Sequence, residues 1–172
     1  PLPGTPVGWE VAGFGDFDAD GDADFIWRNT ATGANRYWEM DGINRLRSVK
    51  TIKVALDWSV AGSGDFDGDG RNDLLWRHES GANVVWLMSG EERVTRGVLP
   101  GAEPGWQVVG IGDFDGDGMD DILWHHETVR ANTIWTLNGD SRKDRASLPQ
   151  TPEGWSVVGV IEMNGDGMAD II

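Results

Sequence analysis

Four short acidic segments hold the residues whose types and spacing point to metal chemistry. Each spans nine residues, with an oxygen-bearing side chain at positions 1, 3, 5 and 9 and glycine at position 6. Side chains at alternate positions can converge on one point, and glycine permits the sharp turn that brings the chain back. Hard oxygen donors without histidine or cysteine favour calcium over zinc or copper. We therefore predict calcium sites in loops 16–24, 65–73, 113–121 and 162–170.

The predicted ligands are the side chains at positions 1, 3, 5 and 9 and the backbone carbonyl at position 7. In chain order, the residues concerned are Asp16, Asp18, Asp20, Asp22, Asp24, Asp65, Asp67, Asp69, Arg71, Asp73, Asp113, Asp115, Asp117, Met119, Asp121, Glu162, Asn164, Asp166, Met168 and Asp170. The fourth loop has one carboxylate fewer among its four donors and a longer first ligand. We predict three strong calcium sites and a weaker or empty fourth.

The first half of each loop is that of an EF-hand, but the second half is not. An EF-hand needs a bidentate glutamate at position 12, where the first three loops have Trp27, Trp76 and Trp124. It also needs flanking helices, whereas the segments beside these loops have the short β-branched and aromatic pattern of strands. The loops are therefore predicted to bind calcium between strands.

Composition excludes several classes of protein. The chain has 172 residues and a net charge of −15, and 17 of its 29 acidic residues lie in the four loops. A nucleic-acid binder needs a basic surface, so none is expected here. The absence of cysteine excludes disulfides, thiolate metal sites and cysteine nucleophiles. No apolar run approaches the roughly 20 residues of a membrane-spanning helix, so membrane insertion is not expected.

The loops belong to an internal repeat that is also marked by tryptophan. Trp9, Trp58, Trp106 and Trp155 are spaced by 49, 48 and 49 residues. Two further series of tryptophans follow in the first three units, so all ten tryptophans occupy repeat positions. Such large side chains suit packing between repeats, which we predict as their role. A platform for stacking sugars is the alternative.

Within each unit, short apolar runs alternate with turn residues. In the second unit the runs predict strands over 58–62, 74–77, 84–88 and 93–99, and no stretch has a sustained helical period. Four strands in about 48 residues match a propeller blade. We predict an all-β fold of about 3.5 blades, each of four antiparallel strands. The single propeller region is 1–172, with units of about 9–57, 58–105, 106–154 and a partial 155–172.

These motifs resemble the FG-GAP/VCBS-like repeats of integrin α-subunit propellers and of many bacterial secreted proteins. The resemblance rests on Asp-x-Asp-x-Asp-Gly-x-x-Asp, on Leu-Leu-Trp-Arg at Leu74–Arg77 and on Trp-Leu-Met-Ser-Gly at Trp86–Gly90. It implies a β-propeller, commonly seven-bladed, with calcium in the loop between the first two strands of each blade. It also implies an extracellular or secreted protein with an adhesion, ligand-binding or scaffold role.

Three and a half blades cannot close a ring, so we expect something else to complete it. The candidates are the remainder of a longer propeller, a second copy of the chain, and head-to-tail addition into a filament. End blades of an open ring expose apolar faces and unpaired strand edges, which associate readily.

The sequence favours a binding or scaffold protein over an enzyme. It has no nucleophile elbow, no phosphate-binding glycine loop and no histidine cluster with metal spacing. His78, His125 and His126 follow the second tryptophan of their units and are interpreted as polar residues at strand ends. The leading hypothesis is an adhesion, assembly or scaffold module. The alternatives are a lectin that binds carbohydrate in grooves between blades and, more remotely, an accessory domain of a secreted hydrolase.

Overall fold

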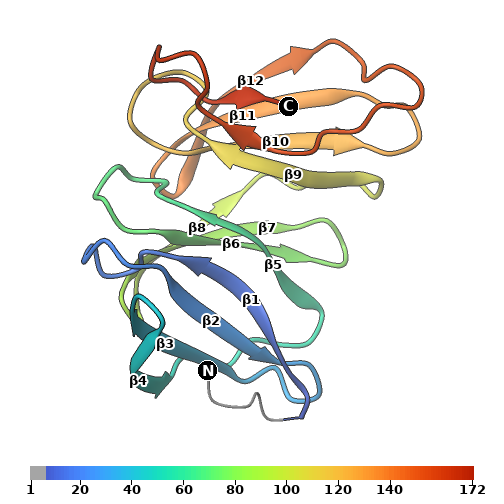
Figure 1. The fold of residues 1–172 in the computed structure, drawn as a ribbon. Helices are drawn as coiled ribbons and strands as arrows, with labels where there is room; N and C mark the ends of the chain where they lie inside the picture. Colours follow the sequence, from blue (N-terminus) through green and yellow to red (C-terminus); the bar gives the residue numbers. More distant parts are fainter. Residues whose placement is uncertain (1–6) are drawn as a thin grey trace.

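Three four-stranded antiparallel sheets follow one another along the chain in the computed structural model, which describes residues 7–172 (Figure 1). The first six residues of the predicted propeller region lie outside the described residues. The first sheet contains β1 (Trp9–Gly15), β2 (Asp24–Asn29), β3 (Asn35–Asp41) and β4 (Asn44–Lys50). The second contains β5 (Trp58–Gly64), β6 (Asp73–His78), β7 (Asn83–Ser89) and β8 (Glu92–Leu99). The third contains β9 (Trp106–Gly112), β10 (Asp121–His126), β11 (Asn132–Asn138) and β12 (Ser141–Leu148).

Each sheet is a blade whose strands are hydrogen-bonded in sequence order. The first strands lie side by side, because β1 packs against β5, β5 against β9 and β9 against β13 (Val160–Ile161). The fourth unit contributes β13 and its partner β14 (Asp170–Ile171). The all-β propeller architecture predicted from the repeat is therefore confirmed, with three whole blades and part of a fourth.

Burial differs strongly between the strands of a blade. The second and third strands are covered on both faces, as the continuous burial of Asp73–Trp76 and Asn83–Trp86 shows. The fourth strand is the outer edge, and β12 is exposed over nearly its whole length. Charged residues on that strand discourage pairing with another sheet. No helix in residues 7–172 has the length and apolar character needed to cross a bilayer.

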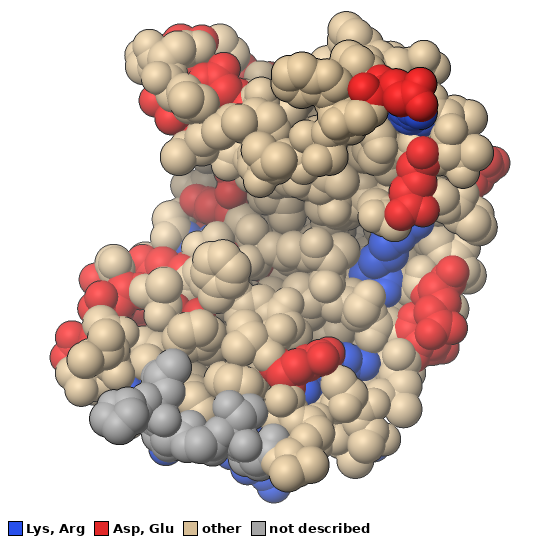
Figure 2. Space-filling view, turned by 45° about the vertical axis from the view of Figure 1, so that its right-hand side comes forward, with Lys and Arg blue, Asp and Glu red and all other residues tan. Residues whose placement is uncertain are grey.

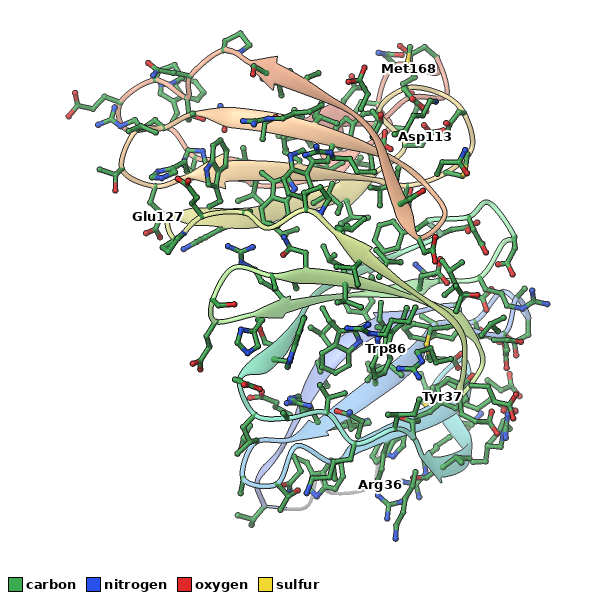
Figure 3. The ribbon with its side chains drawn as sticks, turned by 180° about the vertical axis from the view of Figure 1, so that it is seen from behind. Arg36, Tyr37, Trp86, Asp113, Glu127 and Met168 are labelled. Carbon is green, nitrogen blue, oxygen red and sulfur yellow. The ribbon has the colours of Figure 1, made fainter. Side chains whose placement is uncertain are left out.

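Two hydrophobic clusters in residues 7–172 lie between blades, and a third, formed by Trp27, Trp38 and Met40, lies within the first blade. One cluster joins the first and second blades, and it includes Tyr37 of the first blade and Trp86 of the second (Figure 3). A second cluster joins the second and third blades. Position 2 of the first two acidic loops contributes to them: Phe17 packs with residues of the second blade and Phe66 with residues of the third, both fully buried. A loop of one blade is thus anchored in the core of the next.

The tryptophans divide by position in the repeat. The second and third tryptophans of each unit are buried and pack in pairs, with centroid separations of 4.7 to 4.9 Å. The first tryptophan is half-buried in the three complete blades. Trp155, in the incomplete fourth unit, is 75% exposed. The incomplete fourth unit therefore leaves its tryptophan largely uncovered.

An arginine near the end of the second strand connects the first blade to the second and the second blade to the third. Arg77 donates to the carbonyl oxygens of Ala102 and Trp106, each at 3.1 Å, and its guanidinium lies 5.0 Å from the Trp124 ring centroid. Arg28 makes the same kind of contacts from the first blade to the second. In the third blade this position is His125, whose Nδ1 lies 2.7 Å from Asn132 Oδ1 within its own blade.

Replacing Phe66 tests whether the loop anchor stabilises the junction between blades. We expect Phe66→Ala to lower the free energy of unfolding by about 3 to 5 kcal/mol, because it leaves a cavity in the shared core. Phe14→Ala is the matched control, since Phe14 is 65% exposed, and it should change stability by about 0.5 kcal/mol or less. Urea unfolding followed by tryptophan fluorescence measures both. Equal losses in the two variants would contradict the anchoring role.

Candidate metal centres

The four acidic loops occupy equivalent places in the fold. Each joins the first strand of its unit to the second, and all four lie along one edge of the stack, at the left in Figure 1. Acidic side chains accordingly appear in separate groups in Figure 2 rather than as one continuous acidic face. The predicted ligands thus recur from blade to blade in the same structural setting.

The carboxylate at position 1 folds its own loop. Asp65 Oδ1 accepts hydrogen bonds from the N–H groups of Gly68 and Asp69, at 2.8 and 3.1 Å, and Oδ2 accepts one from Gly70 N–H at 2.8 Å. Asp16 and Asp113 make the same three contacts in their loops. Three backbone donors on one carboxylate close the turn of the loop.

Positions 4 and 6 both require the left-handed backbone that glycine adopts most easily. In the second loop Gly68 has φ of 74° and Gly70 has φ of 85°. The first loop has Ala19 at position 4 with φ of 64°. That conformation is unfavourable for a residue with a Cβ atom, so the first loop carries backbone strain that the others lack.

The carboxylate at position 9 is buried and ties the loop to the third strand. Asp73 Oδ2 accepts from Phe66 N–H at 3.0 Å, and Oδ1 accepts from Met88 N–H at 2.9 Å. Asp24 and Asp121 hold the equivalent pairs of donors. Position 9 therefore fixes the loop to the sheet as well as facing the acidic cluster.

Positions 1, 3 and 9 converge, whereas position 5 lies outside the cluster. In the first three loops, carboxylate oxygens from positions 1, 3 and 9 all lie within 4.8 Å of one another. We call these clusters the carboxylate triads; their members are Asp16, Asp18 and Asp24; Asp65, Asp67 and Asp73; and Asp113, Asp115 and Asp121. The acids at position 5 instead accept from the N–H of position 7, as Asp20 does from Asp22 at 2.9 Å. At position 7 the structure shows this N–H contact, and the predicted role of its carbonyl stays a prediction.

The triads have the character of a site for a hard divalent cation. Burial raises the pKa of Asp73 to about 7 and that of Asp121 to about 6, and it also raises the pKa of Asp24. Asp18 Oδ1 is buried and has no hydrogen-bond partner in the structure. Crowded, desolvated carboxylates are stabilised by a cation among them, and their oxygens are the donors that calcium prefers. The residues present fit this ion.

The fourth loop differs from the other three. Glu162 Oε1 accepts from Asn164 N–H at 2.9 Å and from Gly165 N–H, and Asp170 accepts from Met163 N–H at 3.0 Å. Asn164 at position 3 directs its amide nitrogen toward Asp170 Oδ1, at 3.4 Å. Within residues 7–172, acidic triads form in the first three loops and not here. The weaker fourth site stays a prediction.

Position 8, which sequence reasoning did not single out, links each loop to the preceding one. Asp65 N–H donates to Asp120 Oδ2 at 2.9 Å, and Asp120 N–H donates to the Asp65 carbonyl at 2.7 Å. Asn72 makes the same pair of contacts with Asp16. Ala169 keeps the backbone contact with Asp113, at 2.6 Å, and Figure 3 shows its neighbour Met168 beside Asp113. Because position 8 varies between asparagine, aspartate and alanine, its side chain gave no common signal.

The same junction also holds position 2 of the loop. Gly90 N–H, in the turn before β8, donates to the Phe17 carbonyl at 2.7 Å, and Gly139 N–H donates to the Phe66 carbonyl at 2.9 Å. Each of the first two acidic loops is therefore held by its own third strand through position 9 and by the next blade through positions 1 and 2.

Comparison with known proteins identifies the repeat. Residues 65–124 match the family described as the FG-GAP-like repeat. The match begins at the second acidic loop, includes the third and ends in β10. Over this segment, the match confirms the resemblance to FG-GAP-like repeats. No curated protein matches the chain.

Two substitutions separate the structural role of position 9 from the role of position 3. Asp73→Ala leaves two buried N–H groups without an acceptor, so it should lower the free energy of unfolding by about 2 kcal/mol or more. We expect that loss both in EDTA and in calcium. Asp67→Ala alters an exposed position and should leave stability in EDTA within about 0.5 kcal/mol, while reducing the gain on adding calcium. Denaturant unfolding in both buffers is the measurement. A loss confined to the calcium buffer for Asp73→Ala would argue against its structural role.

Proposed function

We propose that the chain is part of an extracellular calcium-binding β-propeller that serves as an adhesion, assembly or scaffold module. The observation that carries the proposal is the double role of the first three acidic loops. The same residues form a carboxylate triad and hold the junction between consecutive blades. Ion binding at such a loop would stabilise the stacking of blades.

The bound ion would supply positive charge among the triad carboxylates. Asp65, Asp67 and Asp73 would hold it in the second loop, with their equivalents in the first and third. Their mutual repulsion falls when a cation is present, so the loop backbone keeps its turn and Phe66 stays anchored in the next blade. Oxygen donors from aspartate side chains support calcium as the ion.

An extracellular location agrees with this chemistry and remains a proposal. A loop with three carboxylates and no thiolate or imidazole donor suits calcium. A protein without cysteine gains no disulfides in an oxidising environment, so calcium would be its means of cross-linking distant segments.

We propose a non-catalytic role. The histidines that the sequence singled out lie at the ends of β6 and β10. His78 packs edge-on against Trp58, with ring centroids 4.9 Å apart, and its Nε2 lies 2.9 Å from an Asp57 carboxylate oxygen. His126 packs in the same way against Trp106. These contacts support the interpretation of both as strand-end polar residues.

We further propose that additional propeller strands, from the same protein or from another copy, cover the incomplete fourth unit. A largely apolar cavity of about 380 Å³ lies between the third blade and β13–β14, and Leu123, Trp155 and Ile172 are among the residues that line it. An exposed apolar surface of this kind marks a contact site. Sedimentation equilibrium in millimolar calcium would distinguish a monomer from an assembly of copies.

Calcium should raise the thermal stability of the chain. A site filled at 100 times its dissociation constant stabilises the folded state by about 2.7 kcal/mol. For a protein of this size, each kcal/mol raises Tm by roughly 2 to 4 °C. We expect Tm in millimolar calcium to exceed Tm in EDTA by about 5 °C or more, with a smaller effect of magnesium. Circular dichroism melts provide the measurement, and identical midpoints in calcium and EDTA would rule out structural calcium.

Carbohydrate binding is the second candidate function, and two equivalent pockets favour it. One of about 320 Å³ is lined by Trp106, Trp124, Trp135 and Arg145, among others. Another, of about 260 Å³, is lined by their equivalents in the second blade, including Trp58, Trp76, Trp86 and Arg96. Buried indole N–H groups without an acceptor in the structure include those of Trp76, Trp124 and Trp135. A ligand rich in hydroxyl groups would offer partners to the arginines and to the aromatic walls.

A glycan array followed by tryptophan fluorescence titration tests this candidate. If the pockets bind sugar, Arg96→Ala with Arg145→Ala should weaken binding at least tenfold. Arg130→Ala is the control, because Arg130 pairs with Glu153 at 3.7 Å and lies outside both pockets. Equal binding by the double variant and the control would place any sugar site elsewhere.

A further inference from the structure

A lysine from the outer strand of the third blade reaches into the third acidic loop. Lys143 Nζ lies 3.0 Å from Asp115 Oδ2 and 2.8 Å from Asp117 Oδ2. Asp115 belongs to the carboxylate triad of that loop, and Asp117 is the acid at position 5. An ammonium group thus occupies the side of the cluster where two of the loop's carboxylates meet.

A β-bulge directs Lys143 toward the loop. Between β11 and β12, Leu137 is opposite Arg142 and Thr136 is opposite Asp144, so Lys143 is the extra residue of the pair. A bulge of this kind redirects a side chain at the edge of a sheet. The ammonium of Lys143 therefore points at the loop because of backbone geometry as well as charge.

The first two blades have the same bulge but an uncharged residue in it. Their registers skip Leu46 between β3 and β4 and Val94 between β7 and β8. Leu46 is 57% exposed and Val94 is 68% exposed. The bulge position is therefore uncharged in the first two blades and positively charged in the third.

The other cations near the loops do not contact a triad. Arg71 pairs with Asp69 at 2.8 Å, but Asp69 is at position 5 and outside the triad of the second loop. Arg47 pairs with Glu39 and Glu91, which lie outside the loops. In the described range 7–172, the contact between Lys143 and Asp115 is the ion pair that involves a triad carboxylate.

We propose that Lys143 competes with calcium for the carboxylates of the third loop and gives this loop a lower calcium affinity than the second. The proposal rests on the proposed function, since it requires that the loops bind calcium. If calcium binds to Asp115, the ammonium of Lys143 has two alternatives. It either leaves Asp115 and Asp117, or it remains close to the calcium ion and is repelled by its positive charge. Calcium affinity is tuned by the net charge of the ligands, and Lys143 reduces that charge by one.

The consequence is a graded response along the stack. The first loop has an additional acid, Asp22, at position 7, the second has Arg71 paired outside its triad, and the third has Lys143 paired within it. As calcium rises, the junction of the first and second blades should be stabilised before the region where the third blade meets the fourth unit.

Reciprocal substitutions in the full chain test the proposal. In a background with Asp18→Asn and Asp67→Asn, which removes one carboxylate from each of the first two triads, calcium binding reports on the third loop. There, Lys143→Met should lower the calcium Kd about tenfold, because it removes the competing charge and keeps the apolar stem. In a background with Asp18→Asn and Asp115→Asn, Val94→Lys should raise the Kd of the second loop about tenfold. Isothermal titration calorimetry with calcium chloride measures both.

Salt distinguishes charge competition from a packing effect. The difference between Lys143→Met and its parent should shrink in about 1 M KCl, where the Debye length falls to about 3 Å. A loss of packing would not respond in this way. Circular dichroism checks the fold of each variant, and Lys143, with its side chain 47% exposed, should tolerate methionine.

The outcomes separate this proposal from the one on which it rests. If the variant with Asp18→Asn and Asp115→Asn, whose second loop is intact, binds no calcium, the proposed function fails, and this proposal fails with it. If that background binds calcium while neither Lys143→Met nor Val94→Lys changes Kd, the proposed function stands and the competition is overturned. Opposite shifts in the two variants, reduced by salt, would support it.

Discussion

Repulsion between neighbouring carboxylates is the constraint on which the arrangement of each blade depends. Three carboxylates whose oxygens lie within 4.8 Å of one another must be offset by dipoles, by hydrogen bonds or by a cation. The chain uses hydrogen bonds in the first three loops and also a cation in the third. Backbone N–H groups close around position 1, strand N–H groups satisfy position 9, and in the third loop Lys143 pairs with position 3. The negative charge that remains is what would favour a divalent ion in these loops.

The loops matter because the junctions between blades are built from them. Phe66 of the second loop lies in the core of the third blade, while the backbone of Asp65 is bound by Asp120. A blade therefore cannot lose its loop without weakening its neighbour as well. Stability in such a stack is a sum of blade and interface contributions, and here part of the interface contribution comes from the candidate metal site itself.

Much of this organisation can be predicted from the sequence, because it repeats. The spacing of tryptophans and acids predicts four strands per unit, and the structure places β5 to β8 over the expected runs with slightly wider bounds. The convergence of positions 1, 3 and 9 follows from the loop motif. Three features did not follow: position 5 lies outside the triads, position 8 bonds across the junction, and Lys143 reaches Asp115. Each depends on contacts with another strand or blade, which local patterns do not encode.

The arginine connection between blades also bears on how the stack would respond to mechanical load. Arg28 and Arg77 each reach carbonyl oxygens of the following blade, and the guanidinium of each packs over a tryptophan there. His125 stands in the same position of the third blade and bonds to Asn132 within that blade. A pulling force along the chain would therefore meet stronger resistance at the first two junctions than beyond the third blade. The change from guanidinium to imidazole thus favours separation beyond the third blade before separation at the first two junctions.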